Sequence, residues 1–261
     1  MTKRALSLIS VLATLLISQA ALAQLRWVEG THYTAITPPT SYEAPPGKIE
    51  VTEVFSYGCP ACNGTLGPMN KLKTLLPPDA VMNYLHAAFI PTEAWPMFQQ
   101  AYITAKELGI SEATHDMMFT AIWKTGEIPL ADLTTGRIRQ PLPTIADAAR
   151  FYSRHTAVKE AQFLEMAKSF GVATKIKRAD ELVRIWKIPS TPSLVVNGRY
   201  LINMQAAGTW DNVAELVNFL VSQERTRLKM PTPAAKPAAK PATPAAAPKP
   251  ATGAKPTAGA K

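Results

Sequence analysis

The only two cysteines of the chain, Cys59 and Cys62, are separated by Pro60 and Ala61. A Cys-x-x-Cys pair that follows an apolar run and opens a helical pattern is typical of a redox-active dithiol. At this spacing both sulfur atoms lie on one side of the first helical turn, close enough to close a small disulfide ring. The sequence therefore predicts thiol–disulfide exchange at this pair.

Pro60 indicates where the helix begins, because its fixed φ suits the first helical position and its missing N–H group is not needed there. Cys59 is then expected at the N-cap, facing free backbone N–H groups and the positive end of the helix dipole. These groups favour a thiolate, which lowers the pKa of Cys59 and makes it the attacking sulfur. Cys62 lies one turn deeper and is expected to resolve mixed disulfides.

Two structural interpretations of the pair are disfavoured. A purely structural disulfide across two residues would constrain the unfolded chain very little. A zinc site usually needs four ligands, and the histidines, at positions 32, 86, 115 and 155, show no ligand spacing. No metal site is predicted. A chaperone for a soft metal stays open as a less favoured alternative, because no His or Met ligand is expected near the pair, although Met69 and Met204 exist.

Glu53 is an unusual residue in the strand that precedes the cysteines. Alternation over residues 48–57 places it on one face with Ile49, Val51 and Phe55. A carboxylate on an apolar face is paired, protonated or functional, unless that face is open to solvent. Glu53 is therefore a candidate site residue.

The two ends of the chain are distinct from its middle. Residues 1–23 have a positive start (Lys3 and Arg4), an apolar stretch and an A-x-A cleavage site, which predicts a secretory signal peptide. No later run is long and apolar enough to span a bilayer. We expect an exported, soluble protein in a compartment where disulfides persist.

Residues 229–261 form a tail rich in Pro, Ala and Lys that is expected to be disordered. Without the five lysines of residues 231–261 and the two charges of the signal peptide, the net charge of +9 falls to +2 for residues 25–230. The basic charge thus belongs mainly to the ends, so nucleic-acid binding is not predicted. A solvated spacer is the favoured role of the tail, and contact with anionic material of the cell envelope is the alternative.

The pattern between the ends predicts a split α/β unit. An N-terminal arm with a first strand occupies residues 24–48, and strand, helix and strand follow in residues 49–92. Residues 93–187 are predicted as an all-helical insertion, with helices at about 93–108, 112–125, 142–154, 158–170 and 174–186, three of them ended by Gly109, Gly126 and Gly171. Residues 188–228 return to the α/β unit with a hairpin around Asn197-Gly198 and a final helix at 210–227.

Seven aromatic residues are predicted to form the core of the helical insertion. They are Trp95, Phe98, Trp123, Phe151, Phe163, Phe170 and Trp186.

Three separated features together resemble the DsbA family of bacterial periplasmic thiol:disulfide oxidoreductases. They are the Glu-x-Phe-x-Tyr-x-Cys-Pro-x-Cys run from Glu53 to Cys62, the helical insertion, and Thr191-Pro192 ahead of the hairpin. The resemblance covers about residues 25–228. It implies a thioredoxin-like α/β fold with an all-helical insertion domain and a cis peptide bond at Thr191-Pro192.

The resemblance also implies roles for the site residues. Cys59 is the nucleophile, Cys62 the resolving thiol, Glu53 the buried acid near the disulfide, and Thr191 with Pro192 the loop that sets redox behaviour and contacts substrate. The implied substrates are unfolded exported proteins with free thiols, and a DsbB-like membrane protein is the implied reoxidase. A periplasmic monomer without a cofactor is expected.

The chain departs from the family pattern at three places. Ala61 stands where the best-known family motif has a histidine, so Cys59 is expected to have a higher pKa and the protein to be a milder oxidant. Thr191 stands where some relatives have valine. The lysine that often pairs with the buried acid has no clear counterpart, since Asn83 or Tyr84 falls near its place.

The function predicted from these features is disulfide donation to exported proteins. A reductase or an isomerase on the same fold is the alternative. The isomerase is the less favoured of these two, because no dimerisation module is seen before Ile49.

Overall fold

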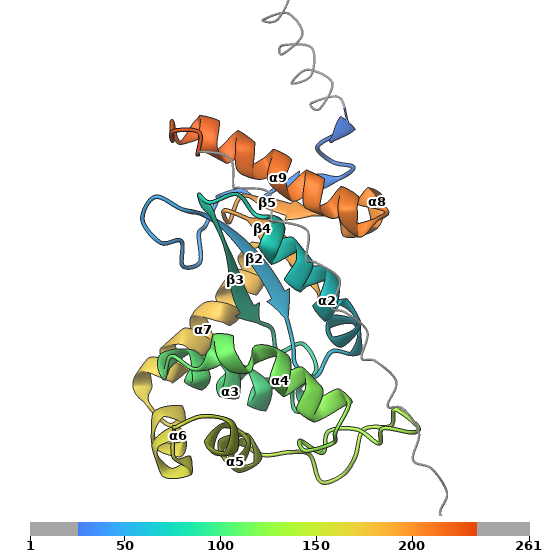
Figure 1. The fold of residues 1–261 in the computed structure, drawn as a ribbon, viewed down its shortest axis with the longest axis vertical. Coiled ribbons are helices and arrows are strands. Elements are labelled where there is room, and N and C mark those ends of the chain that lie inside the picture. The colour runs from blue at the N-terminus through green and yellow to red at the C-terminus, as the bar shows by residue number, and fades with distance from the viewer. Residues whose placement is uncertain (1–25, 234–261) are drawn as a thin grey trace, which may run out of the picture.

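The computed structural model describes residues 26–233 (Figure 1). The predicted signal peptide, residues 1–23, and residues 234–261 of the predicted tail lie outside this range. The strands are β1 (Tyr33–Ala35), β2 (Ile49–Phe55), β3 (Ala80–His86), β4 (Ser193–Val196) and β5 (Tyr200–Ile202). The helices are α2 (Pro60–Leu75), a short η1 (Pro91–Glu93), α3 (Trp95–Glu107), α4 (Ser111–Trp123), α5 (Ile145–His155), α6 (Glu160–Ala167), α7 (Phe170–Ile185), α8 (Met204–Ala207) and α9 (Trp210–Arg227).

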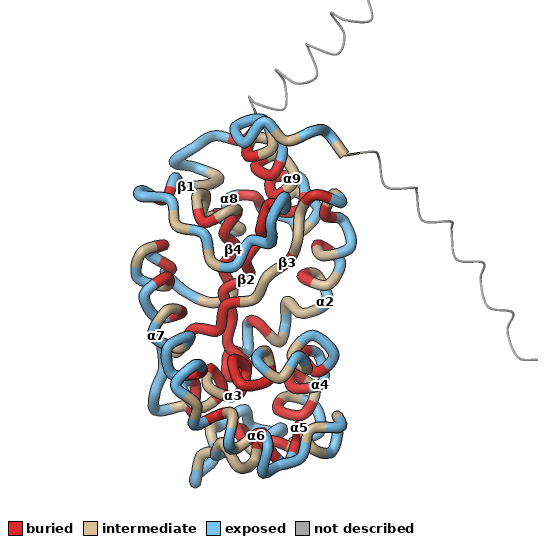
Figure 2. Tube along the Cα trace, turned by 90° about the vertical axis from the view of Figure 1, so that its left-hand side faces the viewer, coloured by how far each residue is buried: buried red, intermediate tan, exposed pale blue. Residues whose placement is uncertain are grey.

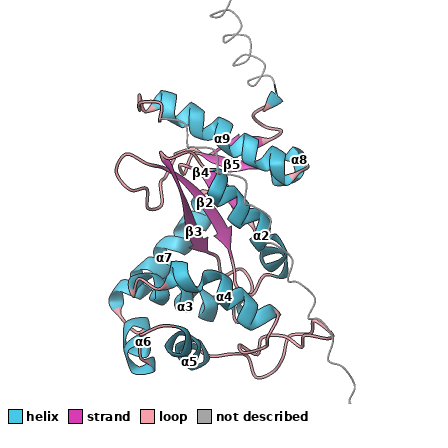
Figure 3. Cartoon of the chain, viewed as in Figure 1, coloured by secondary structure: helices cyan, strands magenta, loops and turns pink. Residues whose placement is uncertain are grey.

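The five strands form one mixed sheet in the order β1-β5-β4-β2-β3. β2 pairs in parallel with β3 and antiparallel with β4, so α2 is the crossover between two parallel neighbours. Every residue of β2 is buried, as expected for an inner strand covered on both faces. Figure 3 shows this sheet between α9 at one end of the molecule and the helical block α3–α7 at the other.

Helices cover both faces of the sheet. On one face, Ile49 and Val51 of β2 pack in a cluster with residues of α2 and α9. On the other face, Val54 packs with Leu182 and Trp186 from the end of α7. The buried course of β2 runs through the centre of Figure 2 and continues into the helical block. Because Glu53 alternates with Val54, its side chain points to the α2 face.

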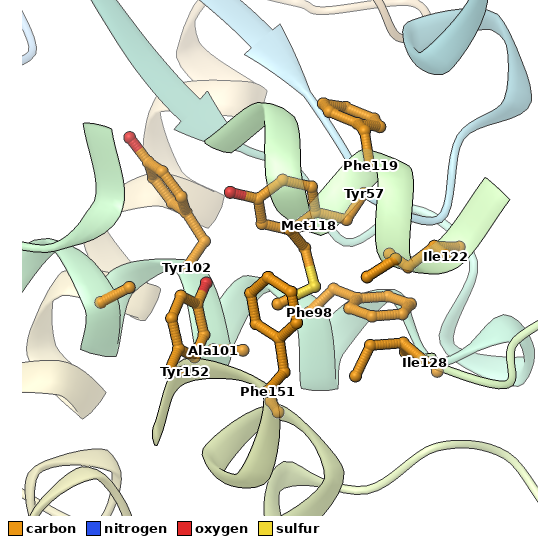
Figure 4. Close-up of a cluster of buried hydrophobic side chains, with 14 of the residues drawn as sticks. Tyr57, Phe98, Ala101, Tyr102, Met118, Phe119, Ile122, Ile128, Phe151 and Tyr152 are labelled. Carbon is orange, nitrogen blue, oxygen red and sulfur yellow. The ribbon is translucent and has the colours of Figure 1, made fainter. Parts of the chain in front are cut away.

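The helices α3–α7 form the all-helical insertion between β3 and β4 that the sequence predicts. Their core joins directly to the end of β2, because Phe55 and Tyr57 belong to the same buried cluster. Figure 4 shows Tyr57 within it. The insertion therefore packs against the segment that leads into the cysteines.

Four of the seven predicted aromatic core residues are fully or almost fully buried in this cluster, namely Trp95, Phe98, Phe151 and Phe163. Trp123 packs against the cluster while partly exposed, and Trp186 is buried against the sheet instead. The prediction for Phe170 is wrong, since it is 87% exposed. Phe170 begins α7, so it lies on an open first turn and not at the end of a buried helix.

The helix ends follow local chemistry, with one correction. Gly109 and Gly126 have φ of 70° and 69° and follow helix ends as predicted. Gly171 is not a terminator, because it lies inside α7. The break is made by Ser169, whose side chain accepts a hydrogen bond from the backbone N of Val172 at 3.2 Å and so caps the new helix.

The predicted hairpin is present. Asn197 and Gly198 have φ of 51° and 58°, and Arg199 N donates to Val196 O at 2.9 Å. Positive φ at both central residues is the turn that matches the twist of the strands. Within residues 26–233, no helix has the length and apolar character needed to cross a membrane.

Candidate active site

The first helical turn of α2 presents the two cysteines. Cys59 N donates to Ser56 O at 3.1 Å, which closes a turn after β2. Cys59 is the N-cap of α2, Pro60 follows at the first position, and Cys59 Sγ accepts a hydrogen bond from Cys62 N at 3.4 Å. Both cysteines are free thiols, 5% and 1% exposed. The structure thus has the N-cap arrangement that the sequence predicts.

The two thiols have opposite acidities. The pKa of Cys59 is lowered to about 6, chiefly by the hydrogen bond from the Cys62 thiol. Thr191 and the backbone N–H groups of Cys62 and Ala61 contribute to the same net shift, and burial opposes it. Burial raises the pKa of Cys62, and the Cys59 sulfur adds to the effect. At neutral pH, Cys59 is therefore the thiolate and Cys62 the thiol.

A loop from the far end of the chain completes the site. The Thr191-Pro192 peptide is cis, as the resemblance implies. Although the two residues are 132 positions apart in the sequence, the Cys59 thiol donates to the carbonyl oxygen of Thr191 at 3.4 Å. The buried hydroxyl of Thr191 has no hydrogen-bond partner among residues 26–233. It can therefore donate to the Cys59 sulfur when that sulfur is ionised.

Glu53 differs from the other buried glutamates. Glu50 accepts hydrogen bonds from Ser41, Tyr42, Glu43 and Asn83, and Glu224 accepts from Asn197 and Arg227. Within the described part of the chain, the Glu53 carboxyl has no such partner, although it is only 3% exposed. Burial raises the pKa of Glu53 to about 8, with further increases from the charges of Cys59 and Asp116.

Neither residue near the place of the family's lysine pairs with the Glu53 carboxyl. Asn83 donates to Glu50 at 3.1 Å and not to Glu53. Tyr84 is directly opposite Glu53 in the β2–β3 ladder and lines a cavity of about 580 Å³ at the β3 edge of the sheet. No cation replaces the lysine within residues 26–233, so Glu53 is protonated at neutral pH.

Apolar side chains border the cysteines. Pro60 and Ala61 are exposed. The ring of Trp95 closely covers Gly58, where an added Cβ would lie 2.9 Å from Trp95 Nε1. The Phe89 ring lies 6.2 Å from the Trp95 ring and is 40% exposed. The surface beside the cysteines is therefore open and largely apolar.

Three neighbours of the site were missed by sequence reasoning. Tyr57 N donates to His86 Nε2 at 3.0 Å, Trp123 Nε1 donates to Tyr57 O at 2.9 Å, and the Tyr57 hydroxyl contacts His115 Nδ1 at 3.2 Å. The sequence pattern predicted no function for either histidine and placed Trp123 in the core of the helical insertion. No pairing of β2 with β3 was predicted from the sequence, and it is the β2–β3 ladder of the structure that places His86 opposite Phe55 at the end of β2.

Curated proteins named thiol:disulfide interchange protein DsbA are similar to this chain. The one from Azotobacter vinelandii is 32% identical over 183 residues, which cover 70% of this chain and 78% of the relative. The chain belongs to the DsbA family. A second DsbA, from Pseudomonas aeruginosa PAO1, is 28% identical over 203 residues, which cover 78% of this chain and 88% of the relative. No family model matches the chain.

Solved structures of DsbA proteins have the same fold. DsbA from Xylella fastidiosa superposes with a TM-score of 0.66 at 27% identity, covering 77% of this chain and 98% of that structure. DsbA from Pseudomonas aeruginosa gives a TM-score of 0.65 at 27% identity, covering 78% and 97%. The predicted thioredoxin-like fold with a helical insertion is thus confirmed. As a DsbA-family protein, the chain is a thiol:disulfide oxidoreductase.

Across residues 26–233, no three His, Cys, Asp or Glu side chains are grouped so that they could hold a metal ion.

Proposed function

We propose that this DsbA-family enzyme donates the Cys59–Cys62 disulfide to unfolded exported proteins. The observation that carries the proposal is the pair of opposed acidities on one helical turn. The pKa of Cys59 is lowered to about 6, while that of Cys62 is raised. A pair of this kind releases its outer sulfur easily and keeps its inner sulfur protonated.

The first step forms a mixed disulfide. A substrate thiolate attacks Cys59 Sγ of the oxidised pair, the new bond joins the substrate sulfur to Cys59, and the Cys59–Cys62 bond breaks. Cys62 leaves as a thiolate and takes up a proton. Glu53 is the proposed donor, because its raised pKa keeps it protonated at neutral pH on the α2 side of the sheet.

The second step releases the product. A second substrate thiolate attacks the substrate sulfur of the mixed disulfide, and Cys59 leaves as a thiolate. The substrate has lost two electrons and gained a disulfide, and the enzyme pair has gained both electrons. In total, the two substrate thiols lose two protons. One is balanced by the proton that Cys62 receives from Glu53, and the other is released to solvent.

The oxidising direction follows from the leaving group. A thiolate of low pKa leaves faster, and a stabilised thiolate in the reduced enzyme favours transfer of the disulfide to substrate. Hydrogen bonds from Cys62 and the α2 N-terminus provide that stabilisation. The apolar surface around Pro60, Ala61 and Phe89 suits extended apolar segments of unfolded chains.

The setting of the reaction is part of the proposal. A signal peptide at residues 1–23 is consistent with export to the periplasm. Each turnover leaves the enzyme reduced, so a DsbB-like membrane protein is proposed to reoxidise it. No cofactor of the chain's own is required by either step, and a monomer is sufficient for both.

Two measurements test the proposal: trapping of a mixed disulfide at Cys59, and the redox potential of the Cys59–Cys62 pair. Reduced Cys62→Ala enzyme, mixed with a peptide that contains a mixed disulfide, should accumulate as a Cys59-linked adduct, which mass spectrometry detects. The wild-type pair, equilibrated with glutathione, should be more oxidising than glutathione. Absence of the adduct would contradict thiol exchange.

The same measurement addresses the alternatives. A potential well below that of glutathione, with an ordinary pKa at Cys59, would favour a reductase. Faster reshuffling of a scrambled disulfide protein than oxidation of a reduced one would favour an isomerase.

A further inference from the structure

Side chains from other elements hydrogen-bond to the backbone of Tyr57, in the turn between β2 and α2. Tyr57 is fully buried. Its backbone N–H donates to His86 Nε2 at 3.0 Å, and its carbonyl oxygen accepts from Trp123 Nε1 at 2.9 Å. His86 ends β3 and Trp123 ends α4. The peptide groups on both sides of Tyr57 are therefore fixed by side chains that do not belong to the turn.

The helical insertion supplies most of these contacts. α4 provides Trp123 and also His115, whose Nδ1 contacts the Tyr57 hydroxyl at 3.2 Å. α3 provides Trp95, whose indole lies so close to Gly58 that a Cβ there would meet Nε1 at 2.9 Å. Figure 4 shows Tyr57 among core side chains of the insertion, with Met118, Phe119 and Ile122 of α4 close by.

We propose that Trp123 and His86 are positioning residues of the redox reaction, which hold the two peptide groups of Tyr57 so that Cys59 Sγ faces the N–H group of Cys62. The inference rests on the proposed function, in which Cys59 is the nucleophile. It gives the helical insertion a part in setting the reactivity of a cysteine that lies outside it.

The position of Tyr57 in the turn is the physical reason. Tyr57 and Gly58 are the central residues of the turn that Cys59 N closes on Ser56 O. Rotation of either peptide group of Tyr57 redirects the chain at the N-cap. The hydrogen bond from Cys62 N to Cys59 Sγ, 3.4 Å long, depends on the direction of the chain at the N-cap, so a rotation there would weaken it. A thiolate that loses this N–H group is less stable.

Trp123→Phe tests the inference, because it keeps an aromatic ring and removes the indole N–H group. We expect the pKa of Cys59 to rise by about 0.5 pH unit, because the hydrogen bond from Cys62 N to Cys59 Sγ is partly lost. The thiolate absorbance at 240 nm of the reduced enzyme, followed against pH, reports this value. His86→Phe removes the acceptor at the other peptide group and should shift the pKa in the same direction.

Trp186→Phe is the matched control. Trp186 is 1% exposed, and its Nε1 donates to Thr40 O at 2.8 Å on the other face of the sheet. Its loss should reduce the free energy of unfolding in urea about as much as Trp123→Phe does, without moving the pKa of Cys59. If both variants shift this pKa equally, or neither does, the positioning role is contradicted.

A measurement on the wild-type enzyme applies even if a variant fails to fold. The indole ¹⁵N–¹H resonance of Trp123 should titrate with the midpoint of Cys59 in the reduced enzyme, whereas that of Trp186 should not. A Trp123 resonance that ignores this midpoint would overturn the inference. A wild-type Cys59 with an ordinary pKa would instead contradict the proposed function, so the two failures are distinguishable.

Discussion

At the scale of single residues, the side chain at position 61 is expected to affect the acidity of Cys59. Ala61 is exposed between the cysteines, so a larger side chain has room there. Ala61→His would place an imidazole beside the sulfur, where its N–H group and charge favour the thiolate. We expect the pKa of Cys59 to fall by about 0.5–1 pH unit, measured by absorbance at 240 nm.

The size-matched neutral variant Ala61→Gln is the control for that substitution. It should leave the pKa of Cys59 closer to the wild-type value of about 6 than Ala61→His does. Equal values for the two variants would show that a histidine at this position has no electrostatic effect in this enzyme.

Glu53 is expected to destabilise the folded enzyme at neutral pH. Its folded pKa of about 8 lies above the ordinary 4.5, so the folded state holds a proton that the unfolded state releases. The resulting cost is absent below pH 4.5 and grows as the pH rises towards 8. Glu53→Gln should therefore raise the free energy of unfolding at pH 7 by about 2–3 kcal/mol, with little effect at pH 4.

Glu50→Gln is the matched comparison in the same strand. Glu50 is equally buried but accepts hydrogen bonds from two backbone N–H groups and two side chains, so its replacement should destabilise the enzyme. Urea unfolding at pH 4 and pH 7 separates the two cases. Destabilisation by both substitutions at pH 7 would contradict the account of Glu53 as an uncompensated acid.

At the scale of elements, the β4–β5 hairpin carries the Thr191-Pro192 loop and needs glycine at its tip. A Cβ on Gly198 would lie 1.9 Å from Thr40 O, and its φ is 58°. Gly198→Ala should therefore cost more than about 3 kcal/mol of unfolding free energy, through strain and displacement of the arm. Circular dichroism during urea unfolding measures the loss.

Gly208→Ala is the control that separates the backbone strain of a positive φ from the steric contact with Thr40. Gly208 also has positive φ, at 83°, but no atom lies within 4 Å of the place that an added Cβ would take. Its substitution should cost only about 1 kcal/mol. Equal losses at both positions would show that the approach of Thr40 has no effect.

Elements that depend on local chemistry could be predicted from the sequence. The hairpin forms around Asn197-Gly198 as predicted, because this pair supplies the turn that follows Ser193–Val196. The final helix, Trp210–Arg227, has the predicted bounds, because the apolar periodicity lies within it. The α6–α7 break could not be predicted in this way. Two local signals compete there, and the Ser169 cap prevails over Gly171.

The same distinction between local sequence signals and long-range packing applies to the residues of the site. The positions of Cys59 and Thr191 follow from motifs, which the family resemblance brings together. The hydrogen bonds of Tyr57 to His86 and Trp123 depend on packing between segments up to 66 residues apart, and no short motif marks them. The lack of a partner for Glu53 is likewise a property of its surroundings and not of its own strand.

At the scale of the whole molecule, folding links acidity to oxidising power. β2 leads into α2, which meets the Thr191-Pro192 loop at Cys59, and groups of α2 and of this loop lower the pKa of Cys59 to about 6. The oxidised enzyme has no thiol to titrate. Above pH 6 the reduced enzyme therefore holds one proton on its sulfur pair, on Cys62, and below pH 6 it holds two.

This proton count predicts how the equilibrium with glutathione depends on pH. Glutathione thiols have ordinary acidity, near pKa 8.5–9, so each exchange above pH 6 releases one proton. The equilibrium constant for oxidation of glutathione should rise about tenfold per pH unit between pH 6 and 8, which corresponds to about 30 mV per unit. It should be nearly constant below pH 6, because the thiolate advantage is lost as the pH falls through the pKa of Cys59.

The measurement is the reduced fraction of enzyme in glutathione buffers from pH 5 to 8, after acid quench and thiol labelling. Glu53 titrates near pH 8 and could add its own slope, so Glu53→Gln is measured alongside. A break near pH 6 that persists in Glu53→Gln belongs to Cys59. A constant that is independent of pH across the whole range would mean that the reduced pair is fully protonated, and the thiolate account of this enzyme's oxidising power would be wrong.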